Sequence, residues 1–79
     1  METNIKIYVI EMITFEVEYK NNRTIRNFLG KKAIMADRNR DSAEKTIEKF
    51  TKSENENREE FKEIYHLEFD YMLQEVSLY

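Results

Sequence analysis

The only histidine of the chain, His66, precedes two carboxylates at alternate positions, Glu68 and Asp70. An imidazole beside a carboxylate can transfer protons near neutral pH, and the same groups are common metal ligands. A single trio of this kind in an alternating segment is explained more simply as an exposed strand residue with acidic neighbours. We therefore predict neither a catalytic residue nor a metal site here.

Residue types that other chemistries require are scarce. The chain has no cysteine, which excludes disulfides, thiolate metal sites and cysteine nucleophiles. Its single glycine rules out a glycine-rich phosphate loop, and no nucleophile motif surrounds Ser42, Ser53 or Ser77. These absences predict a protein that is not an enzyme and that uses no cofactor.

Carboxylates gather in two alternating segments. Glu16 and Glu18 alternate with apolar residues near the start of the chain, and Glu68 and Asp70 do so near its end. If these segments are strands of one sheet, the four carboxylates share its outer face, about 4.8 Å apart from strand to strand. Such a face is either simply solvated or complementary to a basic surface of another protein, and we predict the latter as the partner-binding site.

The segment between these clusters has the opposite charge. Residues 20–40 carry seven cations against one carboxylate, a net +6, although the whole chain is −3. One interpretation is a phosphate-binding arm for nucleic acid. The other is that this strand lies between acidic strands and that its cations pair across with Glu side chains. The candidate nucleic-acid contacts are Arg23, Arg26, Lys31, Lys32, Arg38 and Arg40.

Alternation of apolar and polar residues predicts a hairpin in the first half of the chain. From Ile5 to Tyr19 the odd positions are apolar except Glu11, which is typical of a strand with one buried face. Fifteen residues in one strand are long for so small a domain, so we expect a bulge or break near Glu11 and Met12. Asn21-Asn22 predicts the turn. A second strand follows over residues 23–36, with a bulge or bend at Gly30.

One helix is expected after this hairpin. Asp41 is the predicted N-cap, with Glu44 in the capping-box position. Ala43, Ile47 and Phe50 follow at helical spacing on one face. The helix should end within residues 51–58, where apolar residues stop.

Alternation returns from residue 61 and predicts a third strand, with a phase change after Leu73 that allows a fourth short strand. The fold class is α+β: a small antiparallel sheet in the order β-β-α-β, with one helix packed on its apolar face. Phe50 should meet Phe69 where helix and sheet pack together. The aromatic residues assigned to the core are Phe15, Phe50, Tyr65, Phe69 and Tyr71.

Three apolar residues have the opposite parity from the predicted buried face of the first strand. They are Tyr8, Ile10 and Met12. Because a single helix covers only one face of a sheet, these side chains should form an exposed patch. We predict that this patch makes the protein a homodimer.

Length and composition complete the functional prediction. Seventy-nine residues form a single domain, 1–79, with no membrane-spanning run, and we expect a soluble cytoplasmic protein. Residues with AT-rich codons (Phe, Tyr, Met, Ile, Asn, Lys) account for 37 of the 79, as in an AT-rich bacterium or its phage or mobile element. The predicted function is that of a small regulatory protein that binds and masks or inhibits another macromolecule through its acidic face. The alternative is a nucleic-acid-binding module.

Overall fold

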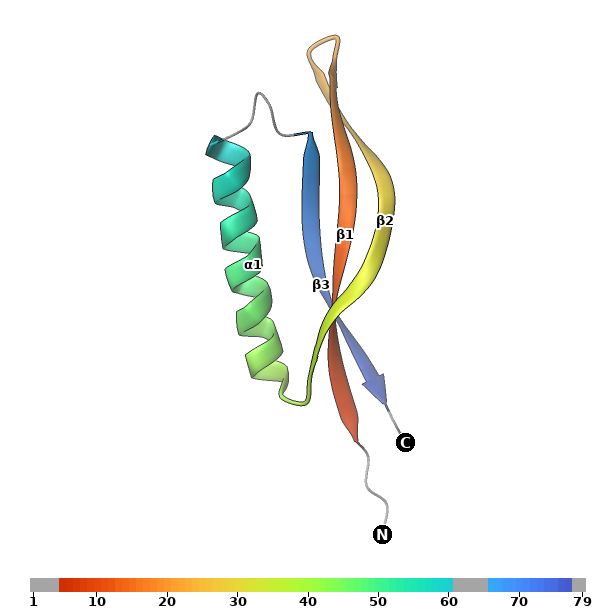
Figure 1. The fold of residues 1–79 in the computed structure, drawn as a ribbon, viewed down its shortest axis with the longest axis vertical. Helices are drawn as coiled ribbons and strands as arrows, with labels where there is room; N and C mark the ends of the chain where they lie inside the picture. The colour runs from red at the N-terminus through yellow and green to blue at the C-terminus, as the bar shows by residue number, and fades with distance from the viewer. Residues whose placement is uncertain (1–4, 61–65, 78–79) are drawn as a thin grey trace.

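The computed structural model describes residues 5–60 and 66–77 and shows a three-stranded antiparallel sheet with one helix packed on it (Figure 1). The predicted α+β class is confirmed. Strand order is β2-β1-β3, so β1 is central, and the expectation that β2 lies between acidic strands is wrong. β3 runs unbroken through its phase change, and the described residues contain no fourth strand. The elements are β1 (Lys6–Lys20), β2 (Arg23–Asp37), α1 (Arg40–Glu60) and β3 (Leu67–Ser77).

The predicted hairpin turn is confirmed. Asn21 and Asn22 join β1 to β2 and both have positive φ, 53° and 61°. A two-residue hairpin loop of this backbone geometry matches the twist of the flanking strands, and asparagine tolerates it better than most residues.

Two bulges on β2 let the long hairpin follow the twist of the sheet. Ile10 pairs with Met35 but Glu11 pairs with Ala33, so β2 carries one extra residue beside the position where the sequence predicted a bulge. A second shift, after the Thr14–Gly30 pair, confirms an irregularity next to the glycine. β1 itself is not interrupted, because strands pair with it on both sides. The molecule is therefore long, 60 × 21 × 15 Å.

The first residue of α1 is set by Asn39 rather than Asp41. The Asn39 side-chain oxygen accepts the backbone N–H of Ser42 at 3.0 Å, and the Asn39 N–H donates to the Asp37 carboxylate at 2.9 Å. The predicted N-cap is thus two residues too late, and Glu44 forms an ion pair with Arg40 at 3.0 Å. The helix also extends beyond the predicted end, to Glu60, because Glu54 and Arg58 in its last two turns hydrogen-bond the backbone of Phe69 in β3.

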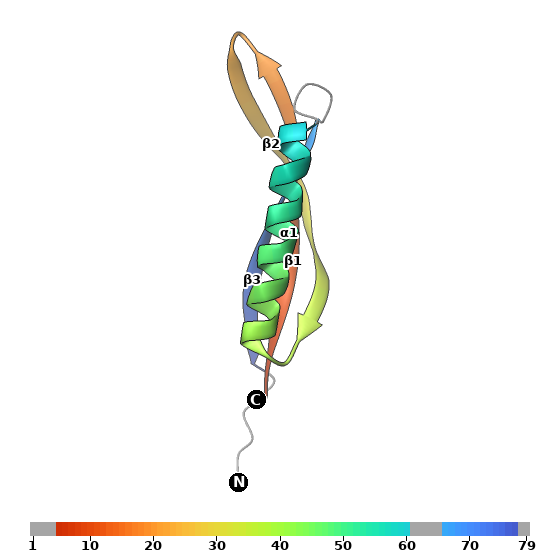
Figure 2. The same ribbon diagram turned by 90° about the vertical axis from the view of Figure 1, so that its left-hand side faces the viewer.

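The helix crosses the sheet obliquely. In its first half it packs on one face, where Ala43 is fully buried and the Phe50 ring lies 5.2 Å from that of Tyr71. In its second half it runs along the outer edge of β3, because the sheet twists beneath it (Figure 2). Phe50 therefore packs against the ring of Tyr71, and the ring pairs of the described residues do not include the predicted partner Phe69.

The face under the helix has the opposite parity from the predicted one. Tyr71 pairs with Met12 and Leu73 with Ile10, so the even positions of β1 point toward α1. Ile10 is 1% exposed and Tyr8 is partly buried. The prediction that these side chains form an exposed patch is wrong, and self-association through them loses its basis.

We call the other side of the sheet the open face, because no helix or strand among the described residues packs over it. Of the aromatic residues assigned to the core, Phe15 lies on this open face and Tyr65 lies outside the described residues. The open face is defined by five β1 residues and their paired neighbours on β2 and β3: Ile7, Val9, Glu11, Ile13 and Phe15. Val17 has the same parity but is only 2% exposed.

Candidate interaction surfaces

The four carboxylates of the predicted partner site do not share a face. Glu68 pairs with Phe15, whereas Glu16 pairs with Leu67. Side chains of directly opposed residues point to the same side of a sheet. Glu68 and Asp70 therefore lie on the open face, and Glu16 and Glu18 lie on the other side. The expected common surface is not formed, because β1 and β3 pair one residue out of the register that it needs.

Glu68 and Asp70 are neutralised by two arginines from different elements. Arg26 of β2 approaches Glu68 at 3.0 Å and Asp70 at 3.1 Å, and Arg58 of α1 approaches them at 3.7 and 3.1 Å. Partial burial acts to raise the pKa of Asp70, but the hydrogen bonds from Arg58 and Arg26 outweigh it and hold that pKa below its usual value. Burial likewise opposes the charge on Arg58, yet the neighbouring carboxylates raise its pKa. These acids already have cationic partners within the fold.

Arg26 reaches them by crossing the central strand. Its guanidinium lies 4.1 Å from the centroid of the Phe15 ring, a cation–π contact. Phe28 meets the same ring edge-on, with centroids 6.2 Å apart. Arg26 therefore covers one end of the open face.

The six candidate nucleic-acid contacts divide equally. Arg26, Lys31 and Arg40 form ion pairs within the fold, with Lys31 3.7 Å from Glu11. On β2, Arg26 and Lys31 thus pair with Glu side chains as the second interpretation predicted, although β2 is an edge strand. Within the described part of the chain no ion pair involves the remaining three residues, Arg23, Lys32 and Arg38.

Two helix residues that sequence reasoning missed close the outer edge of β3. A carboxylate oxygen of Glu54 accepts the Phe69 N–H at 2.6 Å, and Arg58 donates to the Phe69 carbonyl at 2.9 Å. Glu54 is only 5% exposed and also accepts from Arg58 at 3.1 Å. At Phe69 the two side chains thus take the place of a neighbouring strand. Their signal was present, since positions 54 and 58 continue the helical stripe begun by Ala43, Ile47 and Phe50.

The outer edge of β2 has no such cover. All but three of its fifteen residues are exposed, and no described element lies beyond it. A long strand with unpaired N–H and C=O groups is a template for further pairing unless charge or irregularity blocks it. β2 has both safeguards, since it carries four cations against one carboxylate and contains two bulges.

The open face combines apolar residues on its central strand with charged residues on the flanking strands. Its exposed members include Phe28, which is 62% exposed, and Met72, which is 43% exposed. Near the middle of this face Glu11 forms an ion pair with Lys31, and Glu11 is only 8% exposed. The β1 residues on either side of this pair, Val9 and Ile13, are aliphatic, whereas their β3 partners are Gln74 and Asp70.

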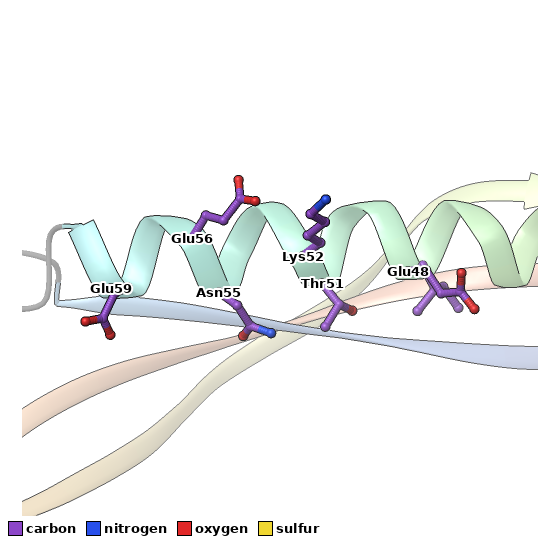
Figure 3. A pocket seen from close by; sticks show the side chains of 7 residues that line it. Glu48, Thr51, Lys52, Asn55, Glu56 and Glu59 are labelled. Carbon is purple, nitrogen blue, oxygen red and sulfur yellow. The ribbon is translucent and has the colours of Figure 1, made fainter.

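Other candidate sites carry little chemistry. His66 is exposed, and its backbone carbonyl accepts the Val17 N–H at 2.7 Å. A hollow beside α1 is lined by seven residues of that helix, among them Glu48, Thr51 and Asn55, with no lining residue from another element (Figure 3). Residues 5–60 and 66–77 contain no cluster of His, Cys, Asp or Glu suited to a metal ion. In the same ranges no helix is long and apolar enough to cross a membrane.

Comparison of the chain with protein-family models, with curated proteins and with solved structures gives no significant match.

Proposed function

We propose that the protein is a small non-enzymatic binding protein that associates with another polypeptide through the open face and thereby masks it. The observation that carries this proposal is a sheet face whose central strand is mostly apolar and which has no covering element among the described residues. Apolar patches of this kind on small proteins are typically interaction surfaces. The open face replaces the acidic face as the proposed contact, because two of the four acids are neutralised and the other two point away from them.

The energetic basis is the burial of aliphatic and aromatic area. Val9 and Ile13 are half-buried within the sheet, and Phe28 and Met72 are exposed. A partner that covers them gains about 25 cal/mol for each Å² of apolar surface removed from water. The ion pairs at the margin of the face would form a polar rim, as is usual around an apolar interface core.

An affinity capture with matched baits tests the proposal. Immobilised wild-type protein and the Val9→Lys variant are each exposed to the lysate of a low-GC bacterium, and the retained polypeptides are compared by quantitative mass spectrometry. Thr51→Lys, an exposed change on α1, adds the same charge away from the open face and serves as the control. We expect polypeptides that wild type and Thr51→Lys retain and that Val9→Lys loses. Identical retention by all three baits would contradict the proposal.

Nucleic-acid binding is the second candidate, favoured by one observation: Arg23, Lys32 and Arg38 form no ion pair within the described residues. A gel shift with duplex and single-stranded DNA at two salt concentrations tests it, since phosphate contacts weaken steeply with salt. Binding that is lost when these three residues are changed to Gln, and that survives Val9→Lys, would establish this candidate over the first.

A further inference from the structure

We propose that the polypeptide bound by the open face is a second copy of this chain, packed sheet against sheet about a two-fold axis. This inference depends on the proposed function, because it needs the open face to be a binding surface. It moves the predicted homodimer contact from the Tyr8–Ile10–Met12 side of β1, which the helix covers, to the opposite side.

The shape of the chain provides the first argument. Its radius of gyration is 15.9 Å, whereas a compact domain of this length has about 12 Å. Its accessible surface is 6407 Å², against about 5,100 Å² for a monomeric protein of the same 9.7 kDa mass. The excess of about 1,300 Å² exceeds the roughly 800 Å² that each partner buries in a standard interface. The surface of the whole chain is therefore large enough to supply an interface of standard size.

The small core provides the second argument. The apolar side chains that are buried in the described ranges are Ile10, Val17 and Ala43. Chains of this size need a full hydrophobic core or a further source of stability, and association of identical subunits is one such source. A second copy is always present when the chain is synthesised, so it can cover the open face during folding, whereas a different partner need not be present.

Charge distinguishes the open face from the β2 edge, which is the other surface through which two copies could pair. On the open face the charge of Glu11 is balanced by Lys31, and the charges of Glu68 and Asp70 are balanced by Arg26 and Arg58. Two copies can thus meet there without net repulsion. Pairing of one β2 edge with another would instead bring two strands of net positive charge together, and cations on an edge strand oppose such pairing. The neutral face is the one suited to a symmetric contact.

Sheet packing gives the contact a definite geometry. Two sheets packed face to face lie about 10 Å apart and interdigitate the side chains of their inner faces. Here those side chains are Val9, Ile13 and Met72, which surround the Glu11–Lys31 pair. A two-fold axis through this region would bury each pair against aliphatic groups of the other copy, so the pair should become less accessible to solvent in the dimer.

Light scattering and thermal melting of the full chain test the proposal. Wild type should have twice the chain mass at micromolar concentration, and its melting temperature should rise with concentration, as expected when folding and association are linked. Val9→Lys and Ile13→Lys should have the mass of one chain or should unfold. Ile25→Lys is the matched control, since Ile25 is exposed and pairs with Glu18 on the other side of the sheet. It should remain a dimer.

Two results would overturn the proposed dimer, and dye binding then tests the proposed function separately. A wild-type protein that stays monomeric at high micromolar concentration, with a melting temperature independent of concentration, excludes it. A dimer that Ile25→Lys dissociates and Ile13→Lys leaves intact has a different interface. In the monomeric case, binding of the apolar dye bis-ANS that Val9→Lys abolishes leaves the proposed function standing with a different partner. Absence of dye binding by the monomer contradicts both proposals.

Discussion

The two outer edges of the sheet, formed by β3 and β2, are protected in different ways. The β3 edge is covered by α1, where Glu54 and Arg58 hydrogen-bond the N–H and the carbonyl of Phe69. The β2 edge has no covering element in the described ranges and carries cations and bulges instead. An edge strand can be protected by hydrogen bonds to its free backbone groups, or by charges and bulges that oppose pairing with a further strand. This small fold uses both.

The difference follows from chain connectivity. β2 leads directly into α1 through Arg38 and Asn39, and the helix must then return alongside the sheet to reach β3. The oblique path of the helix brings its second half to the β3 edge and leaves the β2 edge uncovered (Figure 2). The helix therefore covers one face of the sheet and the β3 edge, and it does not reach the open face.

The largest expected effect concerns the covered edge. Glu54→Ala removes the acceptor for the partly buried Phe69 N–H and a partner of Arg58, so we expect a loss of about 3 kcal/mol of unfolding free energy. Urea denaturation at one fixed protein concentration measures it. Glu54→Gln keeps an acceptor oxygen but no charge and should lose less. An unchanged urea midpoint for Glu54→Ala would mean that the β3 edge is not stabilised by this carboxylate.

A somewhat smaller loss is expected when the arginine of the same edge is removed. Arg58→Met keeps the apolar stem but deletes the bonds to the Phe69 carbonyl and to Asp70, which should cost about 2 kcal/mol. Hydrogen exchange adds a local readout, because the Phe69 amide should be protected in wild type and exchange faster in the variant. Outward-pointing amides of β2 should exchange fast in both proteins, and equal protection of the two edges would contradict the contrast.

Acid should weaken the covered edge through Asp70. The folded-state pKa of this carboxyl is lowered, so its contribution is present above the unfolded pKa of about 3.9 and is lost as the pH falls through the folded value. Asp70→Asn should therefore flatten the loss of stability below about pH 4, a region set by the same reference value. Unfolding curves of wild type and variant across this range measure the effect. Parallel curves would show that Asp70 is not coupled to folding.

The smallest effect on stability is expected at the open edge. Lys32→Val should change the unfolding free energy by no more than about 0.5 kcal/mol, because Lys32 is exposed and has no ion pair in the described residues. It should nevertheless promote aggregation, since the change removes a cation from an unpaired edge. Turbidity over time, with Lys52→Val on α1 as the control, distinguishes the two edges. Equal aggregation of the two variants would assign no protective role to Lys32.

Local sequence patterns predicted the elements well, because each element depends on neighbouring residues. The Asn21-Asn22 turn, the bulge near Glu11 and the helical stripe from Ala43 to Phe50 could all be recognised from short segments. The helix N-cap was misplaced, since Asn39 and Asp41 are both good capping residues. Only the contact between Asp37 and Asn39 shows which of the two is used.

The candidate sites were less predictable, because they depend on register between distant strands. Glu16 and Glu68 were expected on one face, yet a pairing offset of one residue places them on opposite faces. Glu54 and Arg58 continue the helical stripe, but their roles as partners of Phe69 depend on the β3 edge, which packs beside them.

The sequence by itself determined that β1 has two apolar sides, with Ile10 on one and Ile13 on the other, and that a single helix is available to cover one of them. The tertiary structure decided which side. Burial energy is roughly proportional to area and has no direction, so alternation alone cannot choose between two apolar parities. The choice depends on the register of β3 and on the path of α1 from Asn39, and it leaves Ile13 and its neighbours on the open face.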